Sequence, residues 1–200
     1  MAEIIQLTRD EEVASRPFSA RAHTTRDAVV MQTMLSRMRT LAPGWPDAVH
    51  TREPDADGQR HWIRVPDVDA LLSARDLTVV GFFGQARREV DHSLIHELEA
   101  AIVDTLERLP GVLSYYDLAL PPGGFGNLIL CSDPAAPVSV HNHELHRRAV
   151  ELTPRHYRTV RLHTGIVPGR FSSAADLVVE RTRYYDFARE PAWLAVRELG

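Results

Sequence analysis

The chain has 200 residues, of which 44% are apolar and 25% charged, and its formal net charge is −4. These values are typical of a globular protein with one domain and an extension, and they give no reason to expect nucleic acid as a partner. No run reaches the roughly 18 apolar residues of a membrane span, and the N-terminus lacks a secretory signal pattern, so we expect a cytoplasmic protein without a membrane partner.

Residues 1–23 are mostly polar and are expected to form an arm. The stretch from 24 to 42 has helical spacing, because Val30, Met34 and Met38 recur on one face before a Pro-Gly pair. Methionine fills irregular gaps in apolar cores, so the pattern predicts a helix with a buried stripe.

Residues 52–67 are rich in turn formers around Asp57-Gly58 and fit either a small hairpin or a surface loop. Residues 67–74 are long enough for only two helical turns. Together, residues 1–76 are predicted to be an N-terminal arm and helical extension.

The pattern is sharper over residues 77–168, where β-branched and aromatic runs alternate with amphipathic stretches. The order of elements is β-α-β-β-α-β, which is ferredoxin-like. The fold class is therefore predicted as α+β, with two helices on one face of a four-stranded antiparallel sheet and a C-terminal extension over 169–200. The predicted strands are 77–84, 112–120, 125–132 and 156–167, and the helices are 91–110 and 142–152.

Alternation along the strands sorts side chains by sheet face. The apolar set suits the helix-covered face and consists of Tyr116, Leu118, Leu120, Leu128, Leu130, Val160, Leu162 and Ile166. The open face then carries Tyr115, Asp117, Asn127, Tyr157, Arg161 and His163. This polar set fits a small-molecule pocket, or else a dimer interface or a face exposed to water.

For a pocket on this face, His163, Arg161 and Asp117 are the predicted catalytic residues. His163 would act as acid or base and Arg161 would hold an acidic group or an oxyanion. The predicted substrate-binding residues are Tyr115, Asn127 and Tyr157. The single cysteine, Cys131, follows an apolar run and is predicted to be a buried thiol.

The order β-α-β-β-α-β and the stretch HELHRRAVELTPRHYRTVRLHTGIVPG, residues 143–169, resemble one protomer of the dimeric α+β-barrel superfamily. That superfamily includes monooxygenases of the antibiotic-biosynthesis type, haem-degrading enzymes and chlorite dismutase-like haem proteins. The resemblance implies a homodimer that forms a barrel. It covers under half of the chain and carries over no catalytic residue, because the superfamily performs many unrelated reactions.

Three histidines, His141, His143 and His146, cluster at the predicted start of the second helix. Their spacing lacks a third and fourth ligand, as does that of His92 and His96, so no metal site is predicted. Haem b needs only one axial imidazole, and His146 is the candidate ligand, with His163 the alternative.

The predicted function is a small-molecule enzyme, an oxygenase of the antibiotic-biosynthesis monooxygenase type that needs no cofactor because an electron-rich substrate serves as its own reductant. The alternatives are a haem-binding barrel protein and a non-catalytic ligand-binding or interaction protein.

Overall fold

The computed structural model describes residues 4–54, 58–121 and 123–200. The elements in chain order are β1 (Ile4–Leu7), η1 (Pro17–Ser19), α1 (Arg21–Leu41), η2 (Ala42–Gly44), β2 (Val49–Pro54), β3 (Arg60–Val65), α2 (Val68–Ser73), β4 (Arg75–Ala86), α3 (Ser93–Thr105), η3 (Leu106–Arg108), β5 (Val112–Leu120), β6 (Gly124–Cys131), α4 (Ala136–Asn142), α5 (Glu144–His156), β7 (Tyr157–Arg170), β8 (Val178–Asp186) and β9 (Trp193–Glu198).

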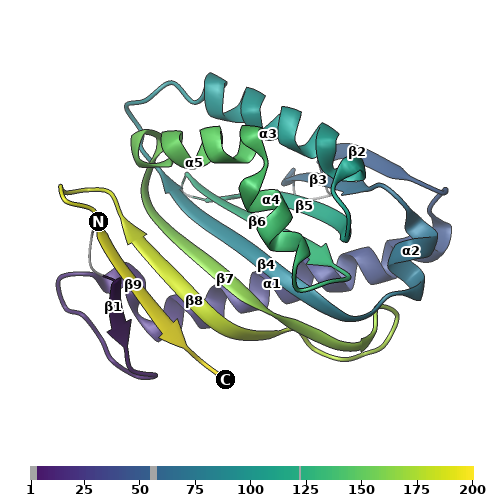
Figure 1. Cartoon of the computed structure of the whole chain (residues 1–200), viewed down its shortest axis with the longest axis horizontal. Helices are drawn as coiled ribbons and strands as arrows, with labels where there is room; N and C mark the ends of the chain where they lie inside the picture. The colour runs from purple at the N-terminus through teal and green to yellow at the C-terminus, as the bar shows by residue number, and fades with distance from the viewer. Residues whose placement is uncertain (1–3, 55–57, 122) are drawn as a thin grey trace.

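The strands form one nine-stranded sheet in the order β1-β9-β8-β7-β4-β6-β5-β3-β2 (Figure 1). Strand β1 pairs with β9 in parallel, and the other neighbours are antiparallel. The sheet is open, with β1 and β2 at its two edges. Strands β2 and β3 pair in antiparallel orientation, as in the predicted hairpin, and residues 55–57, on which the predicted turn falls, lie outside the described residues.

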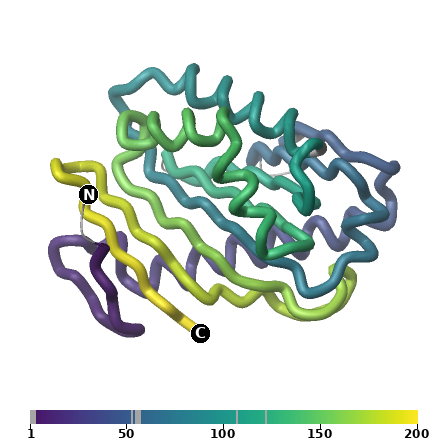
Figure 2. Tube along the Cα trace, viewed as in Figure 1, coloured from purple at the N-terminus to yellow at the C-terminus, as the bar shows by residue number. Residues whose placement is uncertain are grey.

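Helices cover both faces of the sheet. Helix α1 lies on one face, and α3, α4 and α5 lie on the other (Figures 1 and 2). The predicted methionine stripe is confirmed as core, because Met31, Met34 and Met38 of α1 are buried against Val79 and Phe83 of β4. Apolar residues alternate along β4, so this packing removes one complete row of side chains from water.

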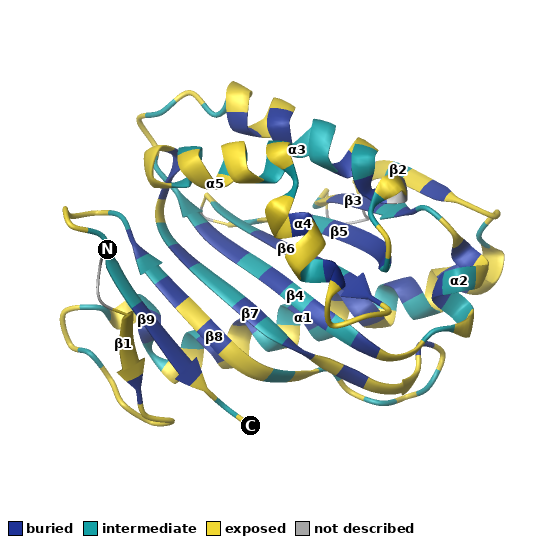
Figure 3. Cartoon of the chain, viewed as in Figure 1, coloured by how far each residue is buried: buried dark blue, intermediate teal, exposed yellow. Residues whose placement is uncertain are grey.

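The second face has its own core beneath α3, α4 and α5. Val103 of α3 and Val140 of α4 pack with Tyr115 and Cys131, which confirms the buried thiol. Farther along, Ile95 of α3 packs with strand β7. Figure 3 shows that buried residues concentrate in the central strands, whereas α3 and α5 keep an exposed outer side.

The predicted fold class, a ferredoxin-like four-stranded sheet with two helices on one face that forms a dimeric α+β barrel, is wrong. The segments before and after it contribute β1, β2, β3, β8 and β9, so the sheet has nine strands. The β-branched and aromatic run of 178–186 carried a strand signal that was interpreted as a tail.

The face predicted to be open is covered by α1, which gives the amphipathic helix of the N-terminal segment its apolar partner. The predicted dimeric barrel needs the open sheet faces of two protomers to meet. In this chain α1 covers that face at the centre of the sheet, so the faces cannot meet there. None of the helices in the described ranges combines the length and apolar character needed to cross a bilayer.

Candidate functional site

The prediction that six polar residues share one sheet face is wrong. Arg161 and His163 face α1, where both contact Asp27. The other four residues lie on the face covered by α3 and α5: Tyr115, Asp117, Asn127 and Tyr157.

The register of the central strands explains this division. Phe82 stands opposite both Leu162 and Asn127, whereas Phe83 stands opposite Arg161. Residues opposite one another project to the same face, so Leu162 lies with Asn127 and not with Arg161. The sequence could not fix this relation, because both faces of the sheet are buried and each strand offers apolar side chains in both phases.

On the α3 face, neighbouring elements bring a polar cluster together beneath the helix. Tyr115 of β5 donates its hydroxyl hydrogen bond to Glu99 of α3. Asp117, two residues further along β5, has Trp62 of β3 as its cross-strand partner. The Trp62 and Tyr115 rings meet edge to face at 5.7 Å between centroids. We call Trp62, Glu99, Tyr115, Asp117 and Asn127 the acidic cluster.

Burial and mutual repulsion perturb the two carboxyl groups of this cluster. Burial, reinforced by the charge of Glu99, raises the pKa of Asp117 to about 8. Burial also raises the pKa of Glu99, against the hydrogen bond from Tyr115. Arg52, whose guanidinium carbon lies 3.8 Å from the centroid of the Trp62 ring, lowers both pKa values without cancelling the rise. At neutral pH the pair therefore holds a proton that isolated carboxylates would have lost.

Two polar atoms of the acidic cluster have no hydrogen-bond partner among the described residues: Asp117 Oδ1 and Trp62 Nε1. Buried polar atoms in native proteins are usually paired with protein, water or ligand. The indole N–H is a donor, and a protonated carboxyl can also donate. Both side chains project from adjacent strands to the same face, so together they offer two donors to an acceptor atom.

The cluster also has an aromatic border. Asn127 Oδ1 accepts a 3.1 Å hydrogen bond from the backbone N–H of Phe82, which holds the amide in place. The Phe82 ring meets the Tyr157 ring at 5.2 Å. Burial raises the pKa of Tyr157 and of Tyr115, so both phenols are neutral at physiological pH.

On the α1 face, the two predicted catalytic residues belong to a fully paired ionic network. Asp27 receives hydrogen bonds from Arg161 Nε at 2.5 Å and Nη2 at 3.0 Å, and from His163 Nε2 at 2.9 Å. The His163 ring has no exposed surface, and its Nδ1 lies 2.9 Å from the hydroxyl of Thr182. Hydrogen bonds from His163 and Arg161 keep the pKa of Asp27 below its usual value despite burial, whereas burial lowers the pKa of His163.

The three clustered histidines of the sequence lie elsewhere, at the junction of α4 and α5. His146 meets His141 at 5.6 Å between ring centroids, and its buried Nδ1 has no side-chain partner among the described residues. His146 does not belong to the acidic cluster. The ring of a second histidine packs against His146, and the haem role of His146 stays a prediction. Among residues 4–54, 58–121 and 123–200, no histidine, cysteine or acidic residues are grouped to hold a metal ion.

Sequence reasoning missed three residues that the structure makes important: Asp27, Glu99 and Trp62. Asp27 lies four residues before Met31 and seven before Met34, so it shares their buried helix face. Glu99 lies four residues after Ile95, which is buried. An acidic residue within an apolar helical stripe was the available signal in both cases. Trp62 gave no comparable signal.

No model of a known protein family matches the chain, and no curated protein matches it. Among solved structures, it is similar to a proposed monooxygenase from Lactobacillus acidophilus NCFM, with 11% identity and a TM-score of 0.44. The similarity covers 80% of this chain and 91% of that chain. At this identity and TM-score, the similarity assigns neither a family nor an activity.

Proposed function

We propose that the protein is an enzyme that acts on a small, largely apolar molecule whose keto or phenolic oxygen binds at the acidic cluster. One observation carries the proposal. Two half-buried carboxyl groups share a site in which Asp117 has a pKa of about 8, and its Oδ1 and the neighbouring Trp62 Nε1 lack partners among the described residues. Perturbed carboxyl pairs of this kind are typical of acid–base catalysis.

The roles of the side chains follow from their protonation states. Asp117 is mostly neutral at pH 7 and donates a hydrogen bond to the substrate oxygen, as does the Trp62 indole. As negative charge develops on that oxygen, both hydrogen bonds strengthen, which favours the transition state over the bound substrate. The Tyr115 hydroxyl hydrogen bond stabilises Glu99 as a carboxylate, so Glu99 is the base.

The reaction proposed at this site is oxygenation without a cofactor. Glu99 removes a proton from a CH₂ group beside the carbonyl, and the resulting enolate is electron-rich. The enolate supplies the electrons that reduce O₂, so that one oxygen atom enters the product as a new carbonyl and the other leaves as water. The substrate is then its own reductant, and the chain only has to bind, deprotonate and stabilise it.

The test is oxygen consumption with a panel of 1,3-diketones and polyphenols. Glu99→Gln and Asp117→Asn are expected to lower kcat/KM at least about 100-fold, the usual range for loss of a general acid or base. Glu97→Gln is the matched control, because Glu97 is exposed on the same helix two residues from Glu99. Equal rates in all three variants would contradict the proposal.

A further inference from the structure

Arg197 of β9 is a fully buried arginine, because its side chain has no exposed surface. The strand register places it in line with Thr182 of β8 and His163 of β7, so its side chain projects to the α1 face. Its neighbours are largely apolar. Leu7 is its partner on β1, and the guanidinium carbon lies 5.5 Å from the centroid of the Tyr184 ring. The guanidinium group therefore lies in the protein interior.

This guanidinium group has one hydrogen-bond acceptor in the described part of the chain. Nη2 of Arg197 donates to the backbone carbonyl of Glu11 at 2.6 Å. Nε and Nη1 are buried and have no acceptor among residues 4–54, 58–121 and 123–200. Arginine stays protonated in proteins, and a buried charge is stable only when it is paired. The structure therefore buries a positive charge that needs a partner.

The described residues do not supply this partner, since none of their carboxylates lies within ion-pair distance of Arg197. The acidic residues that contact it or adjoin it in sequence are engaged elsewhere. The Glu11 carboxylate accepts from the backbone N–H of Thr8 at 3.0 Å, and Glu198 pairs with Arg181 at 2.7 Å. A counter-charge from outside the chain is the remaining source.

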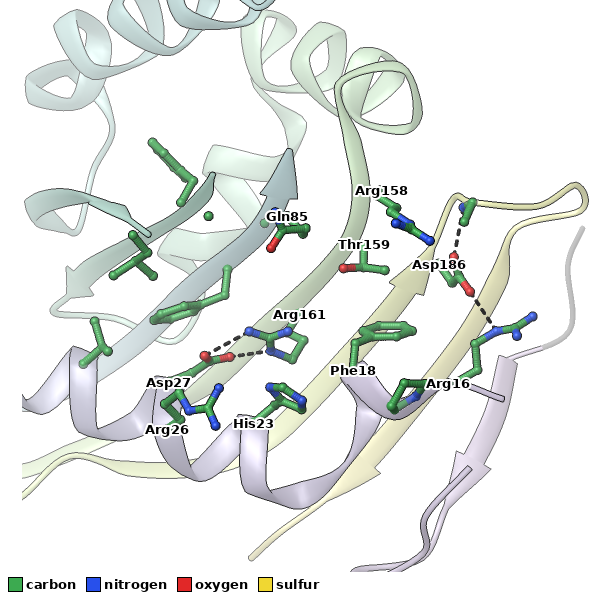
Figure 4. Close-up of a pocket in the computed structure, with 18 of the residues that line it drawn as sticks. Arg16, Phe18, His23, Arg26, Asp27, Gln85, Arg158, Thr159, Arg161 and Asp186 are labelled. Carbon is green, nitrogen blue, oxygen red and sulfur yellow. Dashed lines mark hydrogen bonds and ion pairs between the residues drawn. The ribbon is translucent and has the colours of Figure 1, made fainter. Parts of the chain in front are cut away.

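Residues 8–16, which we call the cover segment, join β1 to η1 and run beside β9 (Figure 1). The contact of Arg197 with the Glu11 carbonyl places this segment over the guanidinium group. Most side chains of the cover segment are exposed, and its C-terminal end is attached by Arg16, which pairs with Asp186 at 2.8 Å (Figure 4). A segment with so few buried side chains opens at little cost, which gives a small solute access to Arg197.

We propose that Arg197 binds a small monovalent anion of the size of chloride beneath the cover segment. A single positive charge is balanced by a single negative charge, and Leu7, Thr182 and Tyr184 carry no second cation that a dianion would need. Because Nε and Nη1 are buried, only a small ion can enter with a limited outward shift of the segment. The bound ion would hold the cover segment against β9. This site is independent of the reaction proposed at the acidic cluster, and either can hold without the other.

The first test is urea unfolding of the unchanged chain in mixtures of sodium chloride and sodium gluconate, at a constant total salt that keeps electrostatic screening equal. Gluconate is too bulky to reach a buried guanidinium group. An ion that binds only the folded chain multiplies the folded-to-unfolded ratio by one plus its concentration divided by its dissociation constant. Above that constant, each tenfold rise in chloride should raise the ratio about tenfold. A ratio that does not change with chloride would overturn the proposal.

Arg197→Met removes the charge and keeps a long side chain among apolar neighbours. In gluconate this variant should be at least as stable as the unchanged chain, because an apolar side chain of similar size replaces a buried charge without loss. It should also abolish the dependence on chloride. Arg181→Met is the matched control, because Arg181 is an exposed arginine on the adjacent strand, and it should keep that dependence. A dependence that survives Arg197→Met, or that Arg181→Met abolishes equally, would contradict the site.

Hydrogen exchange of the backbone amides gives a second readout that needs no variant. Exchange in the cover segment should be slower in chloride than in gluconate at equal total salt, because the anion holds the segment against β9. Equal exchange in the two salts would show that no ion lies beneath the cover segment.

Discussion

Both faces of the sheet bury carboxyl groups, but the pKa values of these groups shift in opposite directions. On the α1 face, Asp27 is almost fully buried, and Arg161 and His163 hold its pKa below the usual value. On the α3 face, Glu99 and Asp117 lie near each other, and both pKa values are raised. A carboxylate with cationic and donor partners stabilises the fold, whereas two carboxyls that share a site retain an exchangeable proton.

The largest effect on stability is expected from Asp27→Asn. The change leaves the largely buried Arg161 without a counter-charge, and removing one partner of such a pair costs about 3 kcal/mol or more. The free energy of unfolding in urea measures this loss. Asp10→Asn breaks the exposed pair with Arg21 and should change stability by less than about 0.5 kcal/mol. Equal effects of the two changes would show that the α1 network is not structural.

On the α3 face, the ionised form of Asp117 should destabilise the fold, whereas the ionised Asp27 on the α1 face stabilises it. The folded-state pKa of Asp117 lies above its unfolded value, so the folded chain binds the extra proton between about pH 4 and pH 8. In that window the group lowers stability as pH rises, by up to about 1.4 kcal/mol per pH unit. Asp117→Asn should remove this contribution.

Urea unfolding at several pH values compares the two proteins. The difference in stability between Asp117→Asn and the unchanged chain should grow from pH 4 to pH 8. A constant difference across that window would mean that Asp117 ionises normally in the folded state.

A smaller effect is expected from Tyr115→Phe, which removes the hydrogen bond to Glu99 and keeps the ring packed against Trp62. Loss of a hydrogen bond to a charged group costs about 1.5 kcal/mol. The change should also raise the pKa of Glu99 further, because that bond favours the carboxylate. Tyr116→Phe, on the neighbouring residue of the same strand, breaks a buried hydrogen bond with His61 instead. It should lower stability without changing the pKa of Glu99, so the pKa change separates the two contacts.

The smallest effects are expected from His141→Ala and His143→Ala. Both lie at the α4–α5 junction, away from the acidic cluster. Activity should stay within about twofold of that of the unchanged chain, as expected for changes away from the site. A large loss of activity would place the site at the histidines instead.

Local elements could be predicted from the sequence because each depends on nearby residues. The helices over 24–42 and 91–110 correspond to α1 and α3, and the strand over 112–120 is β5. The total number of strands could not be predicted in this way, because β8 and β9 were interpreted as a tail. Their place in the sheet depends on pairing with β7, which is a long-range interaction.

The sequence predicts which residues of one strand share a sheet face, but it does not predict which residues of different strands do. Tyr115 and Asp117 lie two residues apart on one strand, and they do share a face. Arg161 and Asn127 lie on strands separated by β4, and only the register shows that they face apart. Glu99 reaches the cluster from a helix, which strand alternation cannot reveal. The catalytic and binding roles assigned to the six residues stay predictions.

The pKa of Asp117 tests the central contrast between the two faces most directly. Carboxyl ¹³C chemical shifts of labelled aspartate, followed from pH 3 to pH 10, measure it in the intact protein. We expect a midpoint of about 8 for Asp117, which should fall in Glu99→Gln because that change removes the neighbouring negative charge, whereas Asp27 should titrate below its usual pKa in both proteins. A midpoint near 4 for Asp117 that does not respond to Glu99→Gln would contradict the account.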